Sequence, residues 1–308
     1  MENYLVAMLV TAGIYALLAQ SVTLAWGMTG LVNLGLAGFW AIGAYASALT
    51  TQGGAVPVPV GLLLALAAGA VAGLVVTFST LRLRDDYLAI VTLGFAEVVR
   101  LAAANEIWLT RGSDGISNIP GHFARTPTFH FNLAWLAVVT VLVFAAWWAL
   151  RRLAAAPWGR ALRAIREDQI VASVAGKPVV RMKAEAFAIS AAIAALAGAL
   201  YGHYNSYIAP DLFQPLVTIY VFLAVTAGGN GRATGAVVGA YLLIAFLEGT
   251  RFVADAVPGV TPLQAAALRE IAVGVALILV LRLRPQGLFP ERNQQAPTGG
   301  AAPLESSR

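Results

Sequence analysis

Two charged residues, Glu97 and Arg100, stand inside a long apolar stretch that runs from Tyr87 to Ala104. A stretch of that length can span a bilayer as a helix, and a charge near its centre costs about 2.5–3.5 kcal/mol on insertion scales. Residues three apart lie on one face of a helix, so the two side chains can form an ion pair. Either the pair lines or gates a path for a solute, or it satisfies itself and locks the packing of helices. The spacing favours the second hypothesis.

A third polar residue, Asn33, lies in another apolar stretch, between Leu31 and Gly35. An amide inside a membrane span usually needs a hydrogen-bond partner, because the lipid offers none. That partner is either a solute in a transport path or a neighbouring helix. The sequence favours neither, so Asn33 is a candidate path residue and a candidate structural residue.

The chain lacks the residues of the common catalytic and metal-binding sites. It contains no cysteine, and its three histidines, at positions 122, 130 and 203, do not have the spacing of metal ligands. Gly176 and Lys177 are followed by Pro178, without the upstream glycine that a phosphate-binding loop requires. No cluster of His, Asp or Glu has the helical spacing that a membrane-embedded enzyme would use. We therefore expect no cofactor, no metal and no enzymatic activity in this chain.

The composition is that of a protein embedded in lipid. Of the 308 residues, 59% are hydrophobic and only 11% are charged, against roughly 25% charged in an average soluble domain. The formal net charge of +5 might suggest nucleic acid as a partner. Its basic residues instead fall in a few hydrophilic loops, where they report membrane orientation. We expect a membrane protein surrounded by lipid, with no nucleic-acid partner.

Apolar stretches separated by short polar segments predict an all-α, polytopic helical bundle with roughly eight to ten transmembrane helices. The expected spans are 4–26, 31–49, 56–80, 87–104, 131–150, 184–203, 215–227, 233–247 and 261–281. Glycines interrupt 27–43 and 228–239, so we expect broken or re-entrant helices there. The segments GLVNLGLAGFWAIGAY and GGNGRATGAVVGAY also resemble each other, which suggests an internal repeat. The alternative is that these glycines merely let helices pack closely.

Lys and Arg cluster in three places: Arg82 with Arg84, residues 151–183, and the segment from Arg282 onward. Such clusters mark cytoplasmic loops. Even numbers of predicted spans separate the three clusters, so all three fall on one side. This places the N-terminus outside and the C-terminus in the cytoplasm. Residues 1–290 form the membrane domain, and the polar tail 291–308, rich in Gly, Pro and Ser, is expected to be disordered.

The hydrophilic loop 151–183 contains the run WGRALRAIREDQIVASVAG, which starts at Trp158. Its pattern predicts one short amphipathic helix that ends at Gly176 and Pro178. The expected apolar side consists of Leu162, Ile165, Ile170, Val171 and Val174, and the polar side of Arg160, Arg163, Arg166, Glu167 and Asp168. By pattern alone, such a helix can lie on lipid headgroups as readily as on a protein.

Four segments resemble the LivM-type permeases of branched-chain amino acid ABC importers. They are LRLRDDYLAIVTLGFAEVVRLAAAN, WGRALRAIREDQIVASVAG, KAEAFAISAAIAALAGALYGHY and LRPQGLFP, and the likeness extends over about residues 1–290. The GRALRAIREDQIVA run and the RPQGLF ending are the specific ones. Two positions depart from the family pattern. Ala96 replaces a glycine in the pattern L-G-F-G-E-I-V-R, and Leu36 stands where the family often has a polar residue, which puts the substrate preference in doubt.

The resemblance implies a bacterial inner-membrane importer with several partners. These are a homologous second permease, two cytoplasmic ABC ATPase subunits that hydrolyse ATP, and a periplasmic substrate-binding protein. It also implies that a cytoplasmic helix docks on the ATPase and transmits its closure. The residues that match this coupling segment are Gly159, Arg160, Leu162, Arg163, Ile165, Arg166, Glu167, Asp168 and Ala172.

The expected solute is a branched-chain or other hydrophobic amino acid. Related permeases carry urea, amides or aromatic acids, so those solutes stay open. A secondary transporter driven by an ion gradient is a further alternative, and it would need a carboxylate free to bind the ion. Glu97 is the candidate for that role, but Arg100 already offers it a partner.

Overall fold

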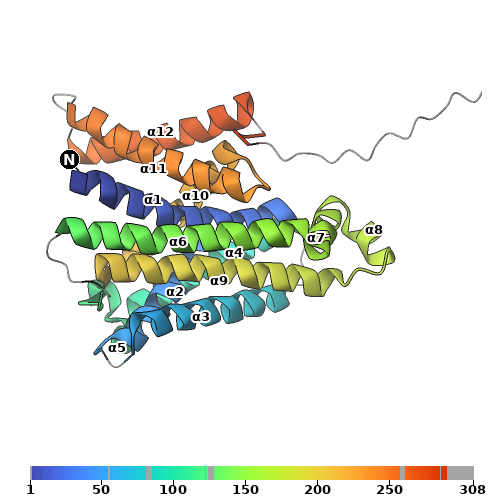
Figure 1. Cartoon of the computed structure of the whole chain (residues 1–308), viewed down its shortest axis with the longest axis horizontal. Coiled ribbons are helices and arrows are strands. Elements are labelled where there is room, and N and C mark those ends of the chain that lie inside the picture. The colour runs from blue at the N-terminus through green and yellow to red at the C-terminus, as the bar shows by residue number, and fades with distance from the viewer. Residues whose placement is uncertain are drawn as a thin grey trace, which may run out of the picture.

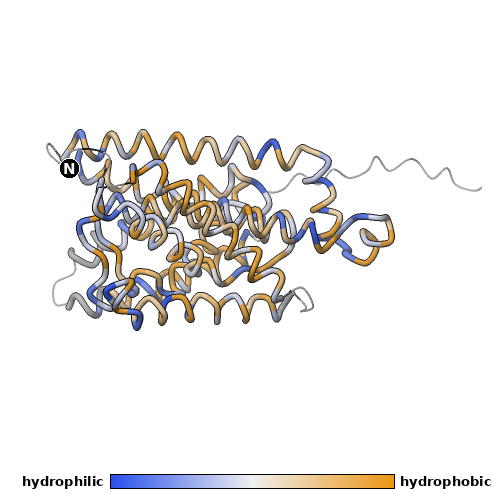
Figure 2. The backbone as a smooth tube through the Cα atoms, turned by 90° about the horizontal axis from the view of Figure 1, so that it is seen from below, coloured by the Kyte–Doolittle hydropathy of each residue, from blue (hydrophilic) through white to orange (hydrophobic). Residues whose placement is uncertain are grey.

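The computed structural model describes residues 2–54, 56–80, 85–121, 123, 128–256, 261–284 and 286–289. The predicted basic cluster at Arg82 and Arg84 and the predicted tail 291–308 lie outside these residues. Helices dominate the described chain and run roughly parallel to one long axis (Figure 1). Figure 2 shows apolar residues along the middle of the bundle and polar residues gathered at its two ends. This banding matches a bilayer with water on both sides.

Nine apolar helices correspond, one to one, to the nine predicted stretches of the described chain. They are α1 (Glu2–Val22), α2 (Leu36–Thr51), α3 (Val58–Thr80), α4 (Asp85–Asn105), α6 (Thr128–Ala155), α9 (Val179–Asn205), α10 (Pro215–Gly228), α11 (Ala233–Ala256) and α12 (Pro262–Leu283). Among the described residues, six helices are long and apolar enough to cross a membrane: α1 with its extension to Met28, α3, α4, α6, α9 and α11. The prediction of an all-α, multi-pass membrane protein is therefore confirmed.

The remaining three helices are shorter or more charged. At a rise of 1.5 Å per residue, α2 with 16 residues and α10 with 14 residues reach about 24 and 21 Å, less than the hydrocarbon core of about 30 Å. Each is preceded by an interruption of the α-helical backbone: the non-helical segment 30–35 before α2, and the short 3-10 turn Pro210–Phe213 before α10. These two helices have the form expected of interrupted spans. Helix α12 is longer but carries Arg269, Glu270 and Arg282.

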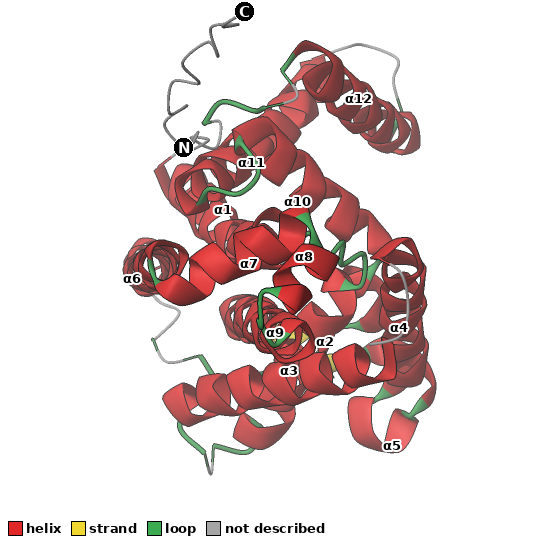
Figure 3. Cartoon of the chain, turned by 90° about the vertical axis from the view of Figure 1, so that its right-hand side faces the viewer, coloured by secondary structure: helices red, strands yellow, loops and turns green. Residues whose placement is uncertain are grey.

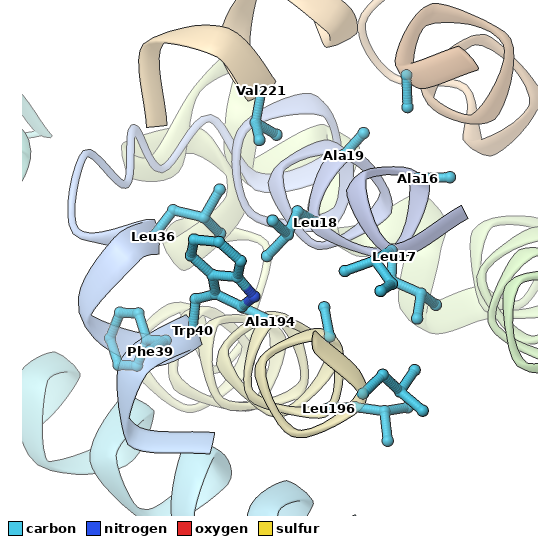
Figure 4. Packing of buried hydrophobic residues seen from close by; sticks show 14 of the residues in the cluster. Ala16, Leu17, Leu18, Ala19, Leu36, Phe39, Trp40, Ala194, Leu196 and Val221 are labelled. Carbon is cyan, nitrogen blue, oxygen red and sulfur yellow. The ribbon is translucent and has the colours of Figure 1, made fainter. Parts of the chain in front are cut away.

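Helix α9 is the most buried of the six long helices and packs against α1, α2 and α3. A methyl group at Gly43 would lie 1.9 Å from the carbonyl oxygen of Ala195, and one at Gly198 would lie 1.9 Å from that of Trp40. Only glycine permits such an approach of two backbones. Figure 4 shows the Trp40 side chain of α2 directed toward Leu18 of α1, with Ala194 of α9 beside it. The small residues predicted at the glycine-rich spans thus serve close packing here.

The two ends of the bundle differ. One end carries the short helix α5 (Ile107–Thr110), the 3-10 helices η2 (Gly112–Asp114) and η3 (Pro210–Phe213), and two antiparallel strands, β1 (Ile116–Ser117) and β2 (Tyr207–Ile208). The other end carries α7 (Pro157–Glu167) and α8 (Gln169–Val174), which project beyond the membrane helices (Figure 1). Seen along the bundle axis, α7 crosses the end of the bundle (Figure 3). It is therefore placed to touch several helices at once.

Candidate functional site

The projecting segment is two helices and not the one predicted. Helix α7 begins with Pro157 in its first turn and ends at Glu167, where Asp168 takes an extended conformation with φ −153° and ψ 106°. The Asp168 carboxylate then accepts hydrogen bonds from the backbone N–H groups of Ile170 and Val171, at 2.8 and 3.0 Å. An aspartate that satisfies the free N–H groups of a first turn starts a new helix. The prediction of a continuous helix was wrong because Asp168 acts as a cap and not as part of a polar face.

One face of α7 is fixed to the membrane domain. Leu162, Ile165 and Ala172 are buried with Met182 and Ala186 of α9. Gly159 lies against the end of α6, since a methyl group there would come within 2.3 Å of the carbonyl oxygen of Leu153. These four predicted coupling residues therefore attach α7 and α8 to the membrane helices α6 and α9.

Three arginines of α7 donate to backbone carbonyl groups at helix ends. Arg160 donates to Ala155 O at 2.9 Å, and Arg163 donates to Ala154 O at 3.1 Å, both at the end of α6. Arg166 donates through Nη1 to Gly27 O, at the end of the first membrane helix. Guanidinium groups suit such positions, because the last carbonyls of a helix lack partners and carry partial negative charge. All three side chains were predicted to form an outer polar face, but Arg163 and Arg166 are half-buried contacts with the membrane helices.

The outer surface of the segment is formed by Glu167, Asp168 and three apolar side chains. Ile170, Val171 and Val174 of α8 are 70, 64 and 85% exposed. The pattern had placed them on one apolar side with Leu162 and Ile165, but the break at Asp168 turns them away from the bundle. The sequence carried one signal of this arrangement, an aspartate two residues before Ile170 that can cap a new helix.

Glu97 and Arg100 form the predicted ion pair on α4. Arg100 Nε donates to both carboxylate oxygens of Glu97, at 3.1 and 3.0 Å. Arg100 Nη1 also lies 3.8 Å from Asp211 Oδ1. The side chains of Arg100 and Glu97 remain 21 and 39% exposed. A charged pair on a membrane helix is thus left partly uncovered by this chain.

Asn33 lies in the non-helical segment 30–35 and is buried. Its Oδ1 accepts a hydrogen bond from Gly35 N–H at 2.9 Å. Leu34 N–H donates to Thr92 Oγ1 of α4 at 3.1 Å, and Ala37 N–H donates to Thr218 Oγ1 of α10 at 3.4 Å. Backbone outside a helix is tolerated at membrane depth only where its polar groups find such partners. The sequence did not indicate the two threonines.

The structure therefore brings the predicted residues together in two places. The α7 residues meet the end of α1, and the Asn33 segment meets α4 at Thr92, on the same helix as Glu97 and Arg100. Within the described part of the chain, no three His, Asp or Glu side chains are grouped as a metal site requires.

Comparison with known proteins agrees with this architecture. The profile of the family described as branched-chain amino acid transport system / permease component matches residues 4–281. The chain is 34% identical to the high-affinity branched-chain amino acid transport system permease protein LivM of Escherichia coli K12, over 96% of this chain and 72% of that protein. The protein of the same name from Salmonella typhimurium is 33% identical, over 92% of this chain and 69% of that protein. The corresponding LivH protein of E. coli K12 is 28% identical, over 89% of this chain and 91% of that protein. On these matches and this fold, the chain belongs to the LivM-type permeases of the branched-chain amino acid ABC transporter family.

Proposed function

We propose that this chain imports branched-chain or other hydrophobic amino acids across the bacterial inner membrane, as one permease of an ATP-driven complex. Two cytoplasmic ATPase subunits hydrolyse ATP, and an external binding protein delivers the solute. The second permease is a homologous chain of different sequence. In support of this, E. coli K12 has two proteins similar to this chain, LivM and LivH, each named a permease protein of the high-affinity branched-chain amino acid system.

The observation that carries the proposal is the outer surface of α7 and α8. Ile170, Val171 and Val174 expose apolar side chains on a segment that projects beyond the bundle (Figure 1). A contiguous apolar patch rimmed by charges such as Glu167 is typical of a protein interface. The segment belongs to the Arg-rich region 151–183, which the positive-inside rule assigns to the cytoplasm. An ATPase on that side would contact this patch.

Orientation follows from the same assignment. With α7 and α8 in the cytoplasm, the end that carries the N-terminus and the β1–β2 strands faces outward. The binding protein would dock at that outer end. The C-terminal residue of α12, Leu283, returns to the cytoplasmic side, since α12 is antiparallel to α11 (Figure 1).

The transport path is proposed to lie between α4 and the partner permease. Lipid is a costly environment for the half-exposed Glu97 and Arg100, whereas a second protein chain can cover them. The paired state of Glu97 also argues against an ion-coupled carrier. Its carboxylate already accepts hydrogen bonds from both Nε and Nη2 of Arg100, and it is not free to bind a proton or a sodium ion at low cost.

Copurification tests this function. A tagged chain isolated gently from its native membrane should bring along a second permease and two ATPases. Val174→Glu should reduce the recovered ATPase at least tenfold, because a charge would enter an apolar interface, while the second permease is retained. Val180→Glu makes the same change at a half-exposed valine of α9 outside the patch and should have no such effect. A wild-type chain recovered without any ATPase would contradict the proposal.

Competition for uptake tests the solute class. Unlabelled leucine, isoleucine and valine should each suppress the uptake of labelled leucine in cells that depend on this complex. If urea or an aromatic acid competes and these amino acids do not, the importer belongs to the same class but carries a different solute.

A further inference from the structure

The first membrane helix ends in an unusual way. After Val22, α1 continues into a π-helical segment, η1 (Thr23–Met28), and the chain then leaves the helix through Gly30 at φ +77°. Gly30 N–H donates to Trp26 O at 3.0 Å and Leu31 N–H donates to Ala25 O at 2.9 Å. π-Helical turns are rare and are frequently found at functional sites.

Arg166 joins this ending to the projecting segment. It stands in the last turn of α7, and its Nη1 donates to Gly27 O. The backbone of Gly30 lies against the same side chain, because a methyl group on Gly30 would come within 3.1 Å of Arg166 Cγ and 3.8 Å of its Cβ. Arg166 of α7 thus contacts two glycines at the end of α1, Gly27 by a hydrogen bond and Gly30 by packing.

Helix α7 is attached to the membrane helices along its length, so movement of α7 is transmitted to them. Leu162 and Ile165, on the turns before Arg166, are buried against α9. Arg160 and Arg163 bond the end of α6, as described above, so the helix is attached along its length. Its outer surface continues into α8, where the exposed apolar patch lies. A force on that patch reaches Arg166 through Glu167 and the capping residue Asp168, which join α8 to the last turn of α7.

The helix ending is also joined to the second glycine-rich break. A methyl group on Gly27 would lie 2.6 Å from the backbone nitrogen of Gly231, so the two backbones touch. The neighbouring Ala227 and Gly228 accept hydrogen bonds, each at 2.9 Å, from the backbone N–H groups of Leu288 and Phe289. The end of α10 is thereby fixed on its far side. The end of α1 is left with α7 on one side and this anchored break on the other.

From Gly30 onward, the non-helical segment 30–35 leads to α2. It reaches α4 through the hydrogen bond from Leu34 N–H to Thr92 Oγ1. A methyl group on Gly35 would lie 2.3 Å from Thr92 O, so the two backbones are also in contact. Helix α4 bears the half-exposed Glu97 and Arg100.

We propose that Arg166 is a positioning residue that transmits movement of α7 to the end of α1, and through segment 30–35 to α4. This inference rests on the proposed importer function, since the force on α7 is taken to come from an ATPase. It assigns Arg166 an inward task, whereas the resemblance had grouped it with residues that contact the ATPase. The described connection runs through the Arg166 side chain, by its hydrogen bond to Gly27 O and its packing on Gly30, so it can be broken without removing the docking patch.

The test uses the complete complex in lipid discs and vesicles. Arg166→Gln should leave assembly intact and change ATP hydrolysis less than twofold, but should lower solute uptake per ATP at least tenfold. Arg166→Lys keeps a charged donor and should recover part of the uptake. Arg152→Gln is the matched control, because Arg152 lies over the ring of Trp148 at 4.8 Å and does not contact the end of α1. Its uptake should equal that of the wild type.

A cross-link provides a second test that does not depend on the loss of function. The chain has no cysteine. A β-carbon added to Gly30 would lie 3.8 Å from Arg166 Cβ, within the range for a disulfide. The double variant Gly30→Cys and Arg166→Cys, in a complex without other cysteines, should show low solute uptake per ATP when it is reduced. Oxidation should restore uptake at least fivefold, because a covalent bond replaces the hydrogen bond. Gly30→Cys alone controls for the strain at φ +77°.

The outcomes separate this inference from the proposed function. A wild-type complex that holds no ATPase would overturn both. A wild-type complex that transports with ATP, combined with normal uptake per ATP in Arg166→Gln, would overturn the inference alone. The inference alone would also be overturned if uptake and assembly fell together in Arg166→Gln and Arg166→Lys. It would likewise be overturned if oxidation of the double-cysteine protein left uptake unchanged.

Discussion

Helices α9 and α4 both cross the bundle, but they are buried to very different degrees. In its most apolar window α9 is 72% buried inside this chain, whereas α4 is 22% buried. Alanines and glycines of α9 sit against the backbones of α2 and α3, and a buried pair of serines joins it to α1. Helix α4 instead presents Ile90, Val98 and the Glu97–Arg100 pair outward.

This contrast separates a scaffold from a surface that needs a partner. The apolar exposed residues of α4 can face lipid, but the charged pair cannot do so cheaply. Close backbone packing around α9 makes that part of the bundle intolerant of added volume. We therefore expect changes in α9 to act on folding and changes in α4 to act on assembly and transport.

The largest effect on folding is expected for Gly198→Ala. Its new methyl group would lie 1.9 Å from Trp40 O, and α2 and α9 would have to separate. The loss should be about 3 kcal/mol, the upper end of the usual cost of overpacking. Thermal unfolding in detergent measures it. Gly94→Ala of α4 is the matched control, because nothing lies within 4 Å of the added group. Equal loss of stability in both variants would contradict the contrast.

Arg100→Ala should lower uptake about tenfold while the isolated chain still folds. The change leaves the Glu97 carboxylate without its partner at the surface where the second permease is proposed to lie. Uptake in vesicles and copurification of the second permease measure the two consequences. The double variant Glu97→Gln and Arg100→Gln should still assemble with the second permease, but its uptake should stay low. If this double change transports normally while each single change abolishes uptake, the pair only locks helix packing.

A smaller effect is expected at the serine pair between α1 and α9. Ser21 Oγ donates to Ser190 O at 2.8 Å and Ser190 Oγ donates to Ser21 O at 2.9 Å, and both residues are buried. Ser190→Ala removes one of these bonds and should cost about 1 kcal/mol. Thermal unfolding measures this loss, and uptake per ATP should not change. A specific loss of uptake would mean that α9 is more than a scaffold.

The sequence predicted the helices well because span length and apolarity depend on local composition. Each of the nine stretches corresponds to a helix, including the short α2 and α10 beside glycine-rich breaks. The ion pair of Glu97 and Arg100 was also predictable, since residues three apart on a helix meet whatever surrounds them. The functional roles of Asn33, Glu97, Arg100 and the α7 residues stay predictions.

Tertiary contacts decided what the sequence could not indicate. An apolar pattern shows that Leu162 and Val174 avoid water, but not that one is covered by α9 and the other is left exposed. Asp168 fits a polar helix face as well as it fits a cap, and only the backbone distinguishes them. Arg166 bonds Gly27 O, a backbone atom 139 positions away, and a contact with a backbone atom cannot be predicted from side-chain types.

The most direct measurement is uptake of labelled leucine into vesicles that hold the purified complex, with the binding protein outside and ATP inside. We expect uptake that requires ATP, persists when proton and sodium gradients are collapsed, and is lost with Val174→Glu. Uptake by this chain alone, driven by an ion gradient without ATP, would contradict an ATP-driven importer.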